Sequence, residues 1–386
     1  MRFFLCKCLA VLFALLLPLH GALAQAPPPR IQADGAVLMD ARTGQVLFEK
    51  NAYKSLAPAS TTKIMTAILA IESGRLDEKT TVSKNAASTN GSTMHLEEGQ
   101  VITLRELLNG LMLRSGNDSA VAIAEFIAGT VDNFVEMMNE KAAELGAYNT
   151  HFRNPHGLSA PGHRSTAYDL AWITRYAMHN RTFADIVNTK HASIDWQDSR
   201  GNEHARSLKN TNKLLWMLEE ADGVKTGTTS EAGPCLVSSA TKDDQRLIAV
   251  TLRDPRRWED SQKLLEWGFA NYALYDYAPA GETLGEIRVE DGFVERLDAV
   301  LDADAAMVVE RAAKGKITAQ VDLPETVKAP VYQGQKLGEL QFSADGKVIR
   351  TFDLVAKSDS EEKTVVRYFL HQLADLFQYF AKWGLL

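Results

Sequence analysis

Residues 58–72 read PASTTKIMTAILAIE, in which a serine and a lysine three positions apart lead into a run of apolar residues. The apolar positions recur at the spacing of one helix face, and they predict a helix over residues 61–72. Ser60 would stand at the N-terminus of this helix, where backbone N–H groups point toward any negative oxygen that forms beside it. Because positions i and i+3 share a helix face, the Lys63 amine can reach the Ser60 hydroxyl.

Two further short segments follow in the chain, Ser115-Gly116-Asn117 and Lys225-Thr226-Gly227. A serine hydroxyl needs a neighbouring base, and Lys63 can serve if burial or a second cation such as Lys225 lowers its pKa. Thr226 offers a hydroxyl to a substrate carboxylate, and Gly227 lets the backbone approach closely. The three segments in this order predict a serine acyl-transfer site.

Two other serine–lysine pairs have the same spacing, so the spacing alone identifies no site. Ser239 and Lys242 follow a strand-like run, where positions i and i+3 point to opposite faces and cannot cooperate. Ser360 precedes an apolar run with acidic residues in its first turn, a pattern typical of a helix N-cap. Ser60 differs because it shares a helix face with its lysine and lies upstream of the other two segments.

Strand patterns lie at both ends of the first 275 residues, with helical patterns between them. Residues 36–50 predict a hairpin, and residues 234–241 and 246–252 predict two strands joined by a polar turn. Helical patterns dominate residues 60–180, with Thr166 as a predicted N-cap, and a last helix is expected over residues 258–272. Ser115-Gly116-Asn117 falls between two helical stretches, on a loop that can hold side chains over a cleft. The arrangement predicts an α+β fold with an antiparallel sheet flanked by helices.

Composition divides the chain into five regions. We expect a signal peptide at residues 1–24, a stiff Pro-rich linker at 25–32 and the acyl-transfer domain at 33–275. Short alternating segments at residues 276–357 predict a small all-β domain, and residues 358–386 predict an amphipathic helix. We interpret the β domain as a spacer that holds the active site off a surface, in preference to a second binding module.

The motif segments and their surroundings resemble a known family. Ser60-Thr61-Thr62-Lys63 and the two later segments resemble the three motifs of penicillin-binding proteins and serine β-lactamases. Residues 34–275 resemble the catalytic domain of low-molecular-weight D-alanyl-D-alanine carboxypeptidases, in which a β domain follows. Further matching segments are Leu113-Arg114-Ser115-Gly116-Asn117-Asp118, His156-Gly157-Leu158, Asp222-Gly223-Val224-Lys225-Thr226-Gly227 and Glu266-Trp267-Gly268-Phe269.

The resemblance implies that the enzyme removes the terminal D-alanine from peptidoglycan pentapeptide stems, and that β-lactam antibiotics inhibit it by acylating the same serine. We expect Lys63 to take the Ser60 proton, and the backbone N–H groups of Ser60 and Thr228 to hold the oxyanion. Ser115 and Lys225 would pass the proton to the leaving nitrogen. Asn117 would hold Lys63 and the substrate amide. Which lysine is neutral stays open.

The terminal carboxylate of such a substrate needs a cation and hydroxyl donors. The resembling enzymes place an arginine about ten residues before the Trp-Gly-Phe segment, which assigns this role to Arg257 beside Thr226. Arg256 is adjacent, so the assignment can slip by one, and a solvated basic pair is the alternative. Ser92 lies in a segment that resembles the loop bordering the family's cleft, and His156 is interpreted as a turn histidine.

Three other functions are consistent with parts of the pattern. A class A β-lactamase uses a glutamate between the second and third motifs, but residues 149–164 contain none. A D,D-endopeptidase acting on crosslinked peptides would use the same motifs. A non-catalytic penicillin-binding scaffold would not need the complete set of motifs that this chain has.

Charge and cysteine content limit the partners and cofactors. The formal net charge of −7 argues against nucleic acid as a partner. Of three cysteines, Cys6 and Cys8 lie in the expected signal peptide, and Cys235 lies in an apolar strand pattern as a small hydrophobic residue. No His, Cys or carboxylate cluster has ligand spacing, so we expect neither a metal nor another cofactor.

The C-terminal region carries apolar residues at helical spacing, with polar residues on the other side. We expect this helix to lie on the surface of the inner membrane, with Trp383 at the headgroup level. The protein would then be exported to the periplasm and attached peripherally. Docking on the protein's own β domain, or a dimer contact, is the alternative. The apolar positions are Val365, Val366, Phe369, Leu370, Leu373, Leu376, Phe377, Phe380 and Trp383.

Overall fold

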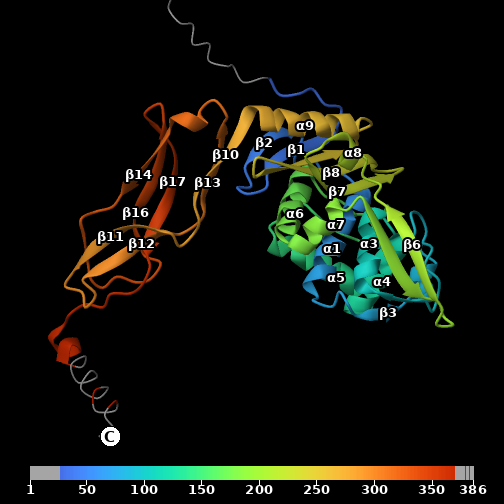
Figure 1. Ribbon diagram of the computed structural model, residues 1–386, viewed down its shortest axis with the longest axis horizontal. Helices are drawn as coiled ribbons and strands as arrows, with labels where there is room; N and C mark the ends of the chain where they lie inside the picture. The colour runs from blue at the N-terminus through green and yellow to red at the C-terminus, as the bar shows by residue number, and fades with distance from the viewer. Residues whose placement is uncertain (1–26, 370–378, 380–381, 383–386) are drawn as a thin grey trace, which may run out of the picture.

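The computed structural model describes residues 27–369, Tyr379 and Lys382. The expected signal peptide at 1–24 and most of the expected C-terminal helix lie outside the described residues. Figure 1 shows two parts that diverge from a junction at β10, one mixed and one built from strands. The predicted α+β class with a following all-β domain is confirmed.

The mixed part contains a five-stranded antiparallel sheet in the order β2-β1-β9-β8-β7. The predicted hairpin forms β1 and β2, and the two later predicted strands form β8 and β9. Asp243 and Asp244 join β8 to β9 with φ of 48° and 63°, as a tight two-residue hairpin turn requires. β7 lies at the edge of the sheet. The bounds are β1 Gly35–Asp40, β2 Val46–Lys50, β7 Ala221–Thr229, β8 Gly233–Lys242 and β9 Gln245–Leu252.

Helices cover both faces of this sheet because its strands are apolar on both sides. Val37, Met39 and Val250 pack under the larger helical layer, whereas Leu38 and Leu247 pack under α8 and α9. Successive residues of a strand pack on opposite faces of the sheet, because side chains alternate in a pleated strand. The helices of the larger layer are α1 Lys63–Glu72, α3 Leu104–Leu113, α4 Asn117–Ala128, α5 Val131–Glu144, α6 Ala167–His179 and α7 Arg181–Asn188; those of the other face are α8 Leu214–Met217 and α9 Arg257–Asn271.

A four-stranded sheet in the order β3-β4-β5-β6 lies beyond α3, and the sequence patterns did not predict it. Its longest strands are mostly exposed and polar, with only Ile194 and Leu208 buried, so no apolar alternation marks them. This sheet lies at the end of the mixed part that is remote from β2 (Figure 1). The elements are β3 Lys79–Thr81, α2 Lys84–Ala87, β4 Val101–Thr103, β5 His191–Gln197 and β6 Glu203–Lys209.

The second part is all-β, as predicted. A six-stranded sheet in the order β14-β16-β17-β12-β11-β15 packs on the pair β10-β13 around Phe342 and Leu340. β10 crosses the boundary expected at residue 275. The bounds are β10 Tyr272–Ala278, β11 Thr283–Glu290, β12 Arg296–Leu301, β13 Ala305–Glu310, β14 Ile317–Asp322, β15 Thr326–Lys328, β16 Lys336–Ala344 and β17 Lys347–Ala356.

Two predicted helix caps have different outcomes. Thr166 caps α6 as predicted, accepting from Asp169 N at 3.0 Å. The prediction that Ser360 is an N-cap is wrong. Ser360 is buried, and its hydroxyl donates to Val294 O at 2.9 Å. This hydrogen bond connects the segment after β17 to the loop between β11 and β12. The following helical turn begins five residues later, and Thr364 accepts there from Arg367 N at 3.3 Å.

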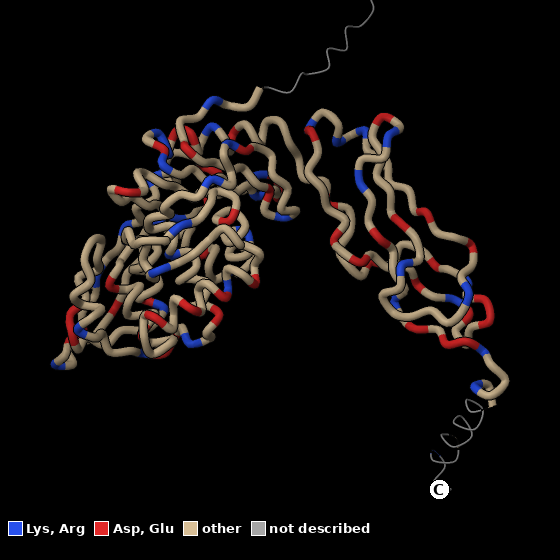
Figure 2. Tube along the Cα trace, turned by 180° about the vertical axis from the view of Figure 1, so that it is seen from behind, with Lys and Arg blue, Asp and Glu red and all other residues tan. Residues whose placement is uncertain are grey.

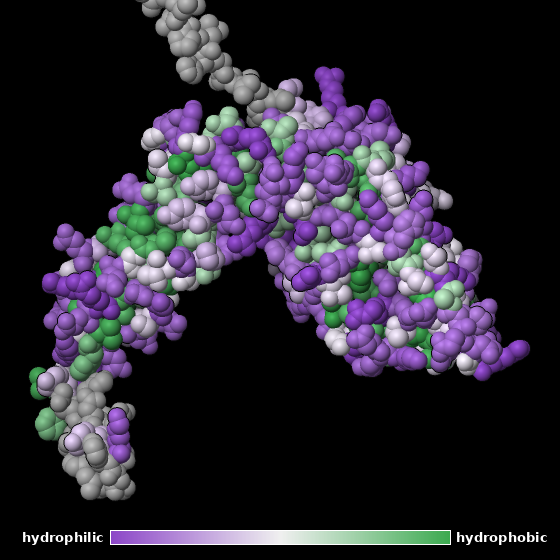
Figure 3. Space-filling view, in the orientation of Figure 1, coloured by the Kyte–Doolittle hydropathy of each residue, from purple (hydrophilic) through white to green (hydrophobic). Residues whose placement is uncertain are grey.

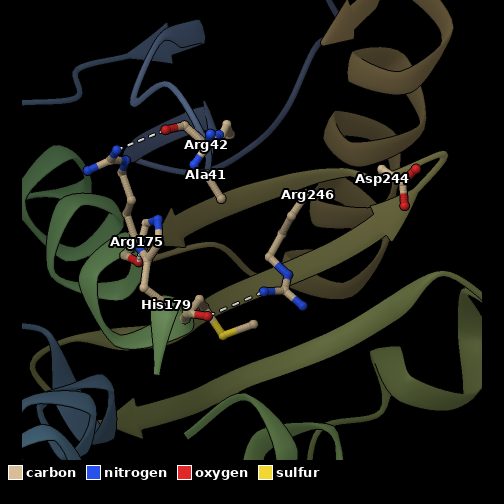
Figure 4. A pocket seen from close by; sticks show the side chains of 7 residues that line it. Ala41, Arg42, Arg175, His179, Asp244 and Arg246 are labelled. Carbon is tan, nitrogen blue, oxygen red and sulfur yellow. Dashed lines mark hydrogen bonds between the residues drawn. The ribbon is translucent and has the colours of Figure 1, made fainter. Parts of the chain in front are cut away.

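Arginine side chains line a pocket beside the junction of the two parts (Figure 4). Arg42 forms an ion pair with Asp304 at 2.8 Å. Arg175 donates to Arg42 O at 2.9 Å, and Arg246 forms an ion pair with Asp222 at 3.0 Å. Because each guanidinium already has an internal partner, we interpret this pocket as part of the junction.

The surface is polar over both parts. Both signs of charge are interspersed along the chain in Figure 2, and hydrophilic side chains cover most of the face seen in Figure 3. Among the described residues, no helix is both long enough and apolar enough to cross a bilayer.

Candidate active site

Ser60 and Lys63 lie where the chain turns into α1. A 3-10 turn over Ala59–Thr62 contains Ser60, so the α-helix begins at Lys63, two residues later than the sequence predicted. The Thr62 hydroxyl stabilises the turn by donating to Ala59 O at 2.8 Å. Lys63 Nζ lies 3.1 Å from Ser60 Oγ, so the predicted pair is in hydrogen-bond contact.

Lys63 is completely buried, and its amine has two further partners. Nζ donates to Asn117 Oδ1 at 2.7 Å and to His156 O at 2.6 Å. Burial lowers the pKa of Lys63 well below its usual value, and the charge of Lys225 lowers it further, against the opposing effect of Asp118. A lowered pKa shifts the lysine toward its neutral form, in which the amine can accept a proton.

Ser115 and Gly116 lie in the connection between α3 and α4, as predicted, and Asn117 is the first residue of α4. Ser115 has φ of +63°, and Asn117 N donates to Ser92 O at 2.7 Å. Asp118, directly after the motif, is buried and accepts from Met94 N at 2.8 Å, which anchors this connection to the loop before β4. Ser92 therefore contributes its carbonyl oxygen, rather than its hydroxyl, to the position of Asn117.

β7 places Lys225 and Gly227 against the start of α1. A Cβ on Gly227 would lie 2.8 Å from Ser60 N, so a larger residue would collide with the nucleophile's backbone. Lys225 is buried, and burial together with the charge of Arg257 lowers its pKa to about 7. The site therefore contains two buried lysines with lowered pKa values, and the charge of Lys225 acts on Lys63.

Arg257 begins α9, and its guanidinium reaches β7. Its Nη1 donates to Gly227 O at 2.7 Å and to Thr228 Oγ1 at 2.8 Å. Arg256 is exposed and contacts Asp254 through its backbone N–H. Of the two arginines that the sequence left open, the structure brings Arg257 to the strand.

Ser239 and Cys235, which were also considered in the sequence, have surroundings that fit a structural role and not a catalytic one. Ser239 donates to the Asp222 carboxylate at 2.5 Å and lies away from Lys242 on the strand, as expected. Cys235 is buried, and burial raises the pKa of its thiol to about 11, which keeps it unreactive. Among residues 27–369, no group of three or more His, Cys, Asp or Glu side chains is arranged to hold a metal ion.

Two contributions to the site were not predicted from the sequence. The His156 ring has its pKa lowered to about 3 by burial and by Lys63, and it is the backbone oxygen of His156 that contacts the lysine. The Asp118 carboxylate accepts hydrogen bonds from the backbone N–H groups of Met94 and Leu96, which lie in a loop distant in the sequence. A backbone carbonyl has no residue-type signal, but the acid that follows Asn117 directly could have been noticed.

Comparison with known proteins agrees with this arrangement. The family described as D-alanyl-D-alanine carboxypeptidase (Peptidase_S11) matches residues 22–256, more than half of the chain. The chain belongs to this family. The C-terminal domain of penicillin-binding protein 5 matches residues 272–362, the region of the all-β part.

Similar proteins span nearly the whole chain. D-alanyl-D-alanine carboxypeptidase DacF of Bacillus subtilis is 34% identical, covering 89% of this chain and 90% of its own length. DacD of Escherichia coli is 35% identical, covering 91% and 92%. The structure of penicillin-binding protein 5 from Haemophilus influenzae superposes with a TM-score of 0.78 at 33% identity, covering 87% of this chain and all of that one.

Membership of this family identifies the class of reaction that the protein catalyses. The protein is a serine-type D-alanyl-D-alanine carboxypeptidase of the low-molecular-weight penicillin-binding type, acting in peptidoglycan metabolism. Penicillin binding is consistent with the same family.

Proposed function

We propose that the protein removes the terminal D-alanine from pentapeptide stems through an ester on Ser60, with neutral Lys63 as the base. The supporting observation is the set of contacts around Lys63 Nζ. A neutral amine has two N–H donors and one lone pair, and two acceptors, Asn117 Oδ1 and His156 O, already occupy its donors. The lone pair is left for the Ser60 hydroxyl, 3.1 Å away.

In the first step Ser60 Oγ attacks the carbonyl between the two D-alanines while Lys63 takes its proton. The oxyanion accepts hydrogen bonds from the backbone N–H groups of Ser60 and Thr228. Support for this pair comes from Gly227, whose missing side chain lets β7 approach Ser60 N closely. The donors are fixed by backbone, so they need not reorganise as charge develops.

In the second step the amide bond breaks and the leaving nitrogen takes a proton. Lys225, with a pKa of about 7, can exchange a proton near neutral pH, and Ser115 can relay it. Thr226 and Arg257 hold the terminal carboxylate, with Gly227 and Thr228 forming the strand backbone beside it. Asn117 orients Lys63 and the substrate amide. Water then hydrolyses the Ser60 ester and releases the shortened stem.

The location we propose is the periplasm, with the C-terminal helix attached to the surface of the inner membrane. Residues 1–24 have the basic, apolar and small-residue pattern of a signal peptide. At the start of the C-terminal helix, Val365, Val366 and Phe369 are 88%, 71% and 67% exposed. Their exposure favours a membrane surface over docking on the β domain.

The activity is tested by incubating purified protein with a pentapeptide stem and quantifying free D-alanine and the tetrapeptide. We expect equal amounts of both products, and none from the Ser60→Ala variant. Release of D-alanine by the variant at the wild-type rate would contradict the proposal.

A further inference from the structure

The Thr62 hydroxyl, two residues after the nucleophile, is held by a histidine that lies 101 positions later in the chain. His163 is buried, and its Nε2 lies 2.8 Å from Thr62 Oγ1. The other ring nitrogen, Nδ1, accepts a hydrogen bond from Arg153 N at 2.9 Å. Because a backbone N–H can only donate, Nδ1 carries no proton, and a neutral ring must carry its proton on Nε2. His163 therefore donates to the Thr62 hydroxyl.

The surroundings of His163 keep its ring neutral. Burial, together with the charges of His151 and Lys63, lowers the pKa of His163 to about 4. Near neutral pH the ring consequently has one donor and one acceptor, and both are in use. The ring cannot turn over without losing both hydrogen bonds, so its orientation is fixed.

This chain of hydrogen bonds ends on the peptide group that precedes Ser60. The Thr62 hydroxyl, which accepts from His163, donates its own hydrogen to Ala59 O at 2.8 Å. Ala59 O and Ser60 N belong to one planar trans peptide group, in which the C=O and the N–H point in opposite directions. A hydrogen bond that fixes the carbonyl therefore also fixes the direction of the Ser60 N–H.

The Ala59 backbone needs support from its surroundings. Its φ is +51°, in the left-handed region, where a residue with a Cβ is strained and persists only if neighbouring groups hold it. Gly157 packs directly on the same carbonyl, since a Cβ there would lie 1.9 Å from Ala59 O and 2.9 Å from Thr62 Oγ1. The Ala59 carbonyl is thus held by one hydroxyl and enclosed by one glycine.

We propose that His163 is a positioning residue for the oxyanion site, acting through Thr62 on the direction of the Ser60 N–H. The inference rests on the proposed function, in which this N–H and that of Thr228 hold the oxyanion. An oxyanion accepts stronger hydrogen bonds than the carbonyl from which it develops. A misdirected Ser60 N–H should therefore slow formation of the ester and leave binding of the intact substrate almost unchanged.

The test uses acylation by benzylpenicillin, because stopped-flow measurement separates the dissociation constant of the first complex from the rate constant of acylation. His163→Asn keeps an acceptor for Arg153 N but is too short to reach Thr62. His163→Gln can place an amide N–H at the position of Nε2–H. We expect the acylation rate constant to fall about tenfold in His163→Asn, with the dissociation constant within about twofold of wild type.

The two controls separate the donor from the ring. In His163→Gln the acylation rate constant should stay within about threefold of the wild-type value, because the donor to Thr62 is kept. His179→Asn, at an exposed histidine at the end of α6, is the matched control for the substitution itself and should change neither constant.

Thr62 tests the same chain of hydrogen bonds from its other end, and does so even if His163→Asn fails to fold. Thr62→Val keeps the shape of the side chain and removes the hydroxyl, whereas Thr62→Ser keeps the hydroxyl. The acylation rate constant should fall about tenfold in Thr62→Val and stay within about threefold in Thr62→Ser.

Wild-type rate constants in His163→Asn and Thr62→Val would overturn the inference, and so would equal losses in His163→Asn and His163→Gln. A weaker first complex with an unchanged rate constant would also overturn it, because His163 would then act on substrate binding. In each of these cases, acylation of wild-type Ser60 would leave the proposed function standing. Wild-type enzyme that is not acylated on Ser60 would contradict the proposed function itself.

Discussion

Lys63 and Asn117, 54 positions apart in the chain, are joined by a 2.7 Å hydrogen bond from Nζ to Oδ1. Asn117 is itself held by its Nδ2, which donates to Asn90 O at 2.7 Å. The side-chain amide therefore has a fixed orientation, with its oxygen toward the lysine. This contact connects the helix that bears the nucleophile to the second motif.

Asn117→Ala should slow acylation because the buried Lys63 amine loses an acceptor. An unsatisfied buried donor costs about 1–3 kcal/mol, or roughly 5- to 150-fold in kcat/KM. Stopped-flow measurement of penicillin acylation, alongside D-alanine release, checks this. Asn202→Ala, on the exposed β5–β6 turn, is the control. Unchanged acylation in Asn117→Ala would show that the contact does not support the base.

Lys225→Met should stabilise the protein at pH 7 while it impairs turnover. The folded-state pKa of about 7 lies far below the usual value near 10.5, so folding makes proton binding by Lys225 less favourable. The unfolded chain binds more protons between these two values, and wild-type stability therefore rises with pH across that window. The lost Lys225 hydrogen bond to Thr226 O offsets only about 1 kcal/mol.

Thermal melting at pH 7 and at pH 10 measures this effect. The variant should melt above the wild type at pH 7, and the difference should shrink at pH 10, where the wild-type lysine is neutral in the folded state and the pH approaches its unfolded-state pKa near 10.5. Lys79→Met, at an exposed lysine of β3, should show no such pH dependence. A variant that melts below wild type at pH 7 would mean that the pKa of Lys225 is not lowered by its surroundings.

Arg257→Gln should weaken turnover of peptides with a free terminal carboxylate far more than that of the corresponding amides. A charge-assisted hydrogen bond is worth about 1.5–3 kcal/mol, or roughly 10- to 150-fold in kcat/KM. Arg256→Gln is a matched control, since Arg256 is adjacent but exposed. Equal losses on both peptides would assign Arg257 to holding Gly227 and Thr228 alone.

Truncation after Ser358 should release active enzyme from membranes, because it removes the apolar face that begins at Val365. The measurement is the distribution of D-alanine release between soluble and membrane fractions. A truncated protein that stays with the membranes would contradict attachment through this helix. Since Ser360 Oγ bonds to Val294 O, a second truncation after Thr364 keeps that contact and should give the same result.

The serine–lysine pair could be predicted because it follows helix spacing, and the second segment because it falls between two helical patterns. Lys225-Thr226-Gly227 was assigned by residue type and by resemblance, and no strand was predicted over β7. The choice between Arg256 and Arg257 depended on the residue at which α9 begins. A shift of one residue turns a different arginine side chain toward β7, and sequence patterns do not locate a helix start that closely. The β5–β6 hairpin was missed because its exposed strands have no apolar face. Ser360 was predicted to be an N-cap because two acidic residues follow it directly. The residue that caps the helical turn is Thr364, four positions later.

The covalent adduct of a penicillin tests the central claim most directly. Purified protein is labelled with benzylpenicillin and digested, and mass spectrometry locates the modified residue. The proposed mechanism predicts one adduct, on Ser60 within the peptide that contains Lys63, and no labelling of Ser60→Ala. An adduct on Ser115, Ser239 or Ser360, or undiminished labelling of Ser60→Ala, would contradict it.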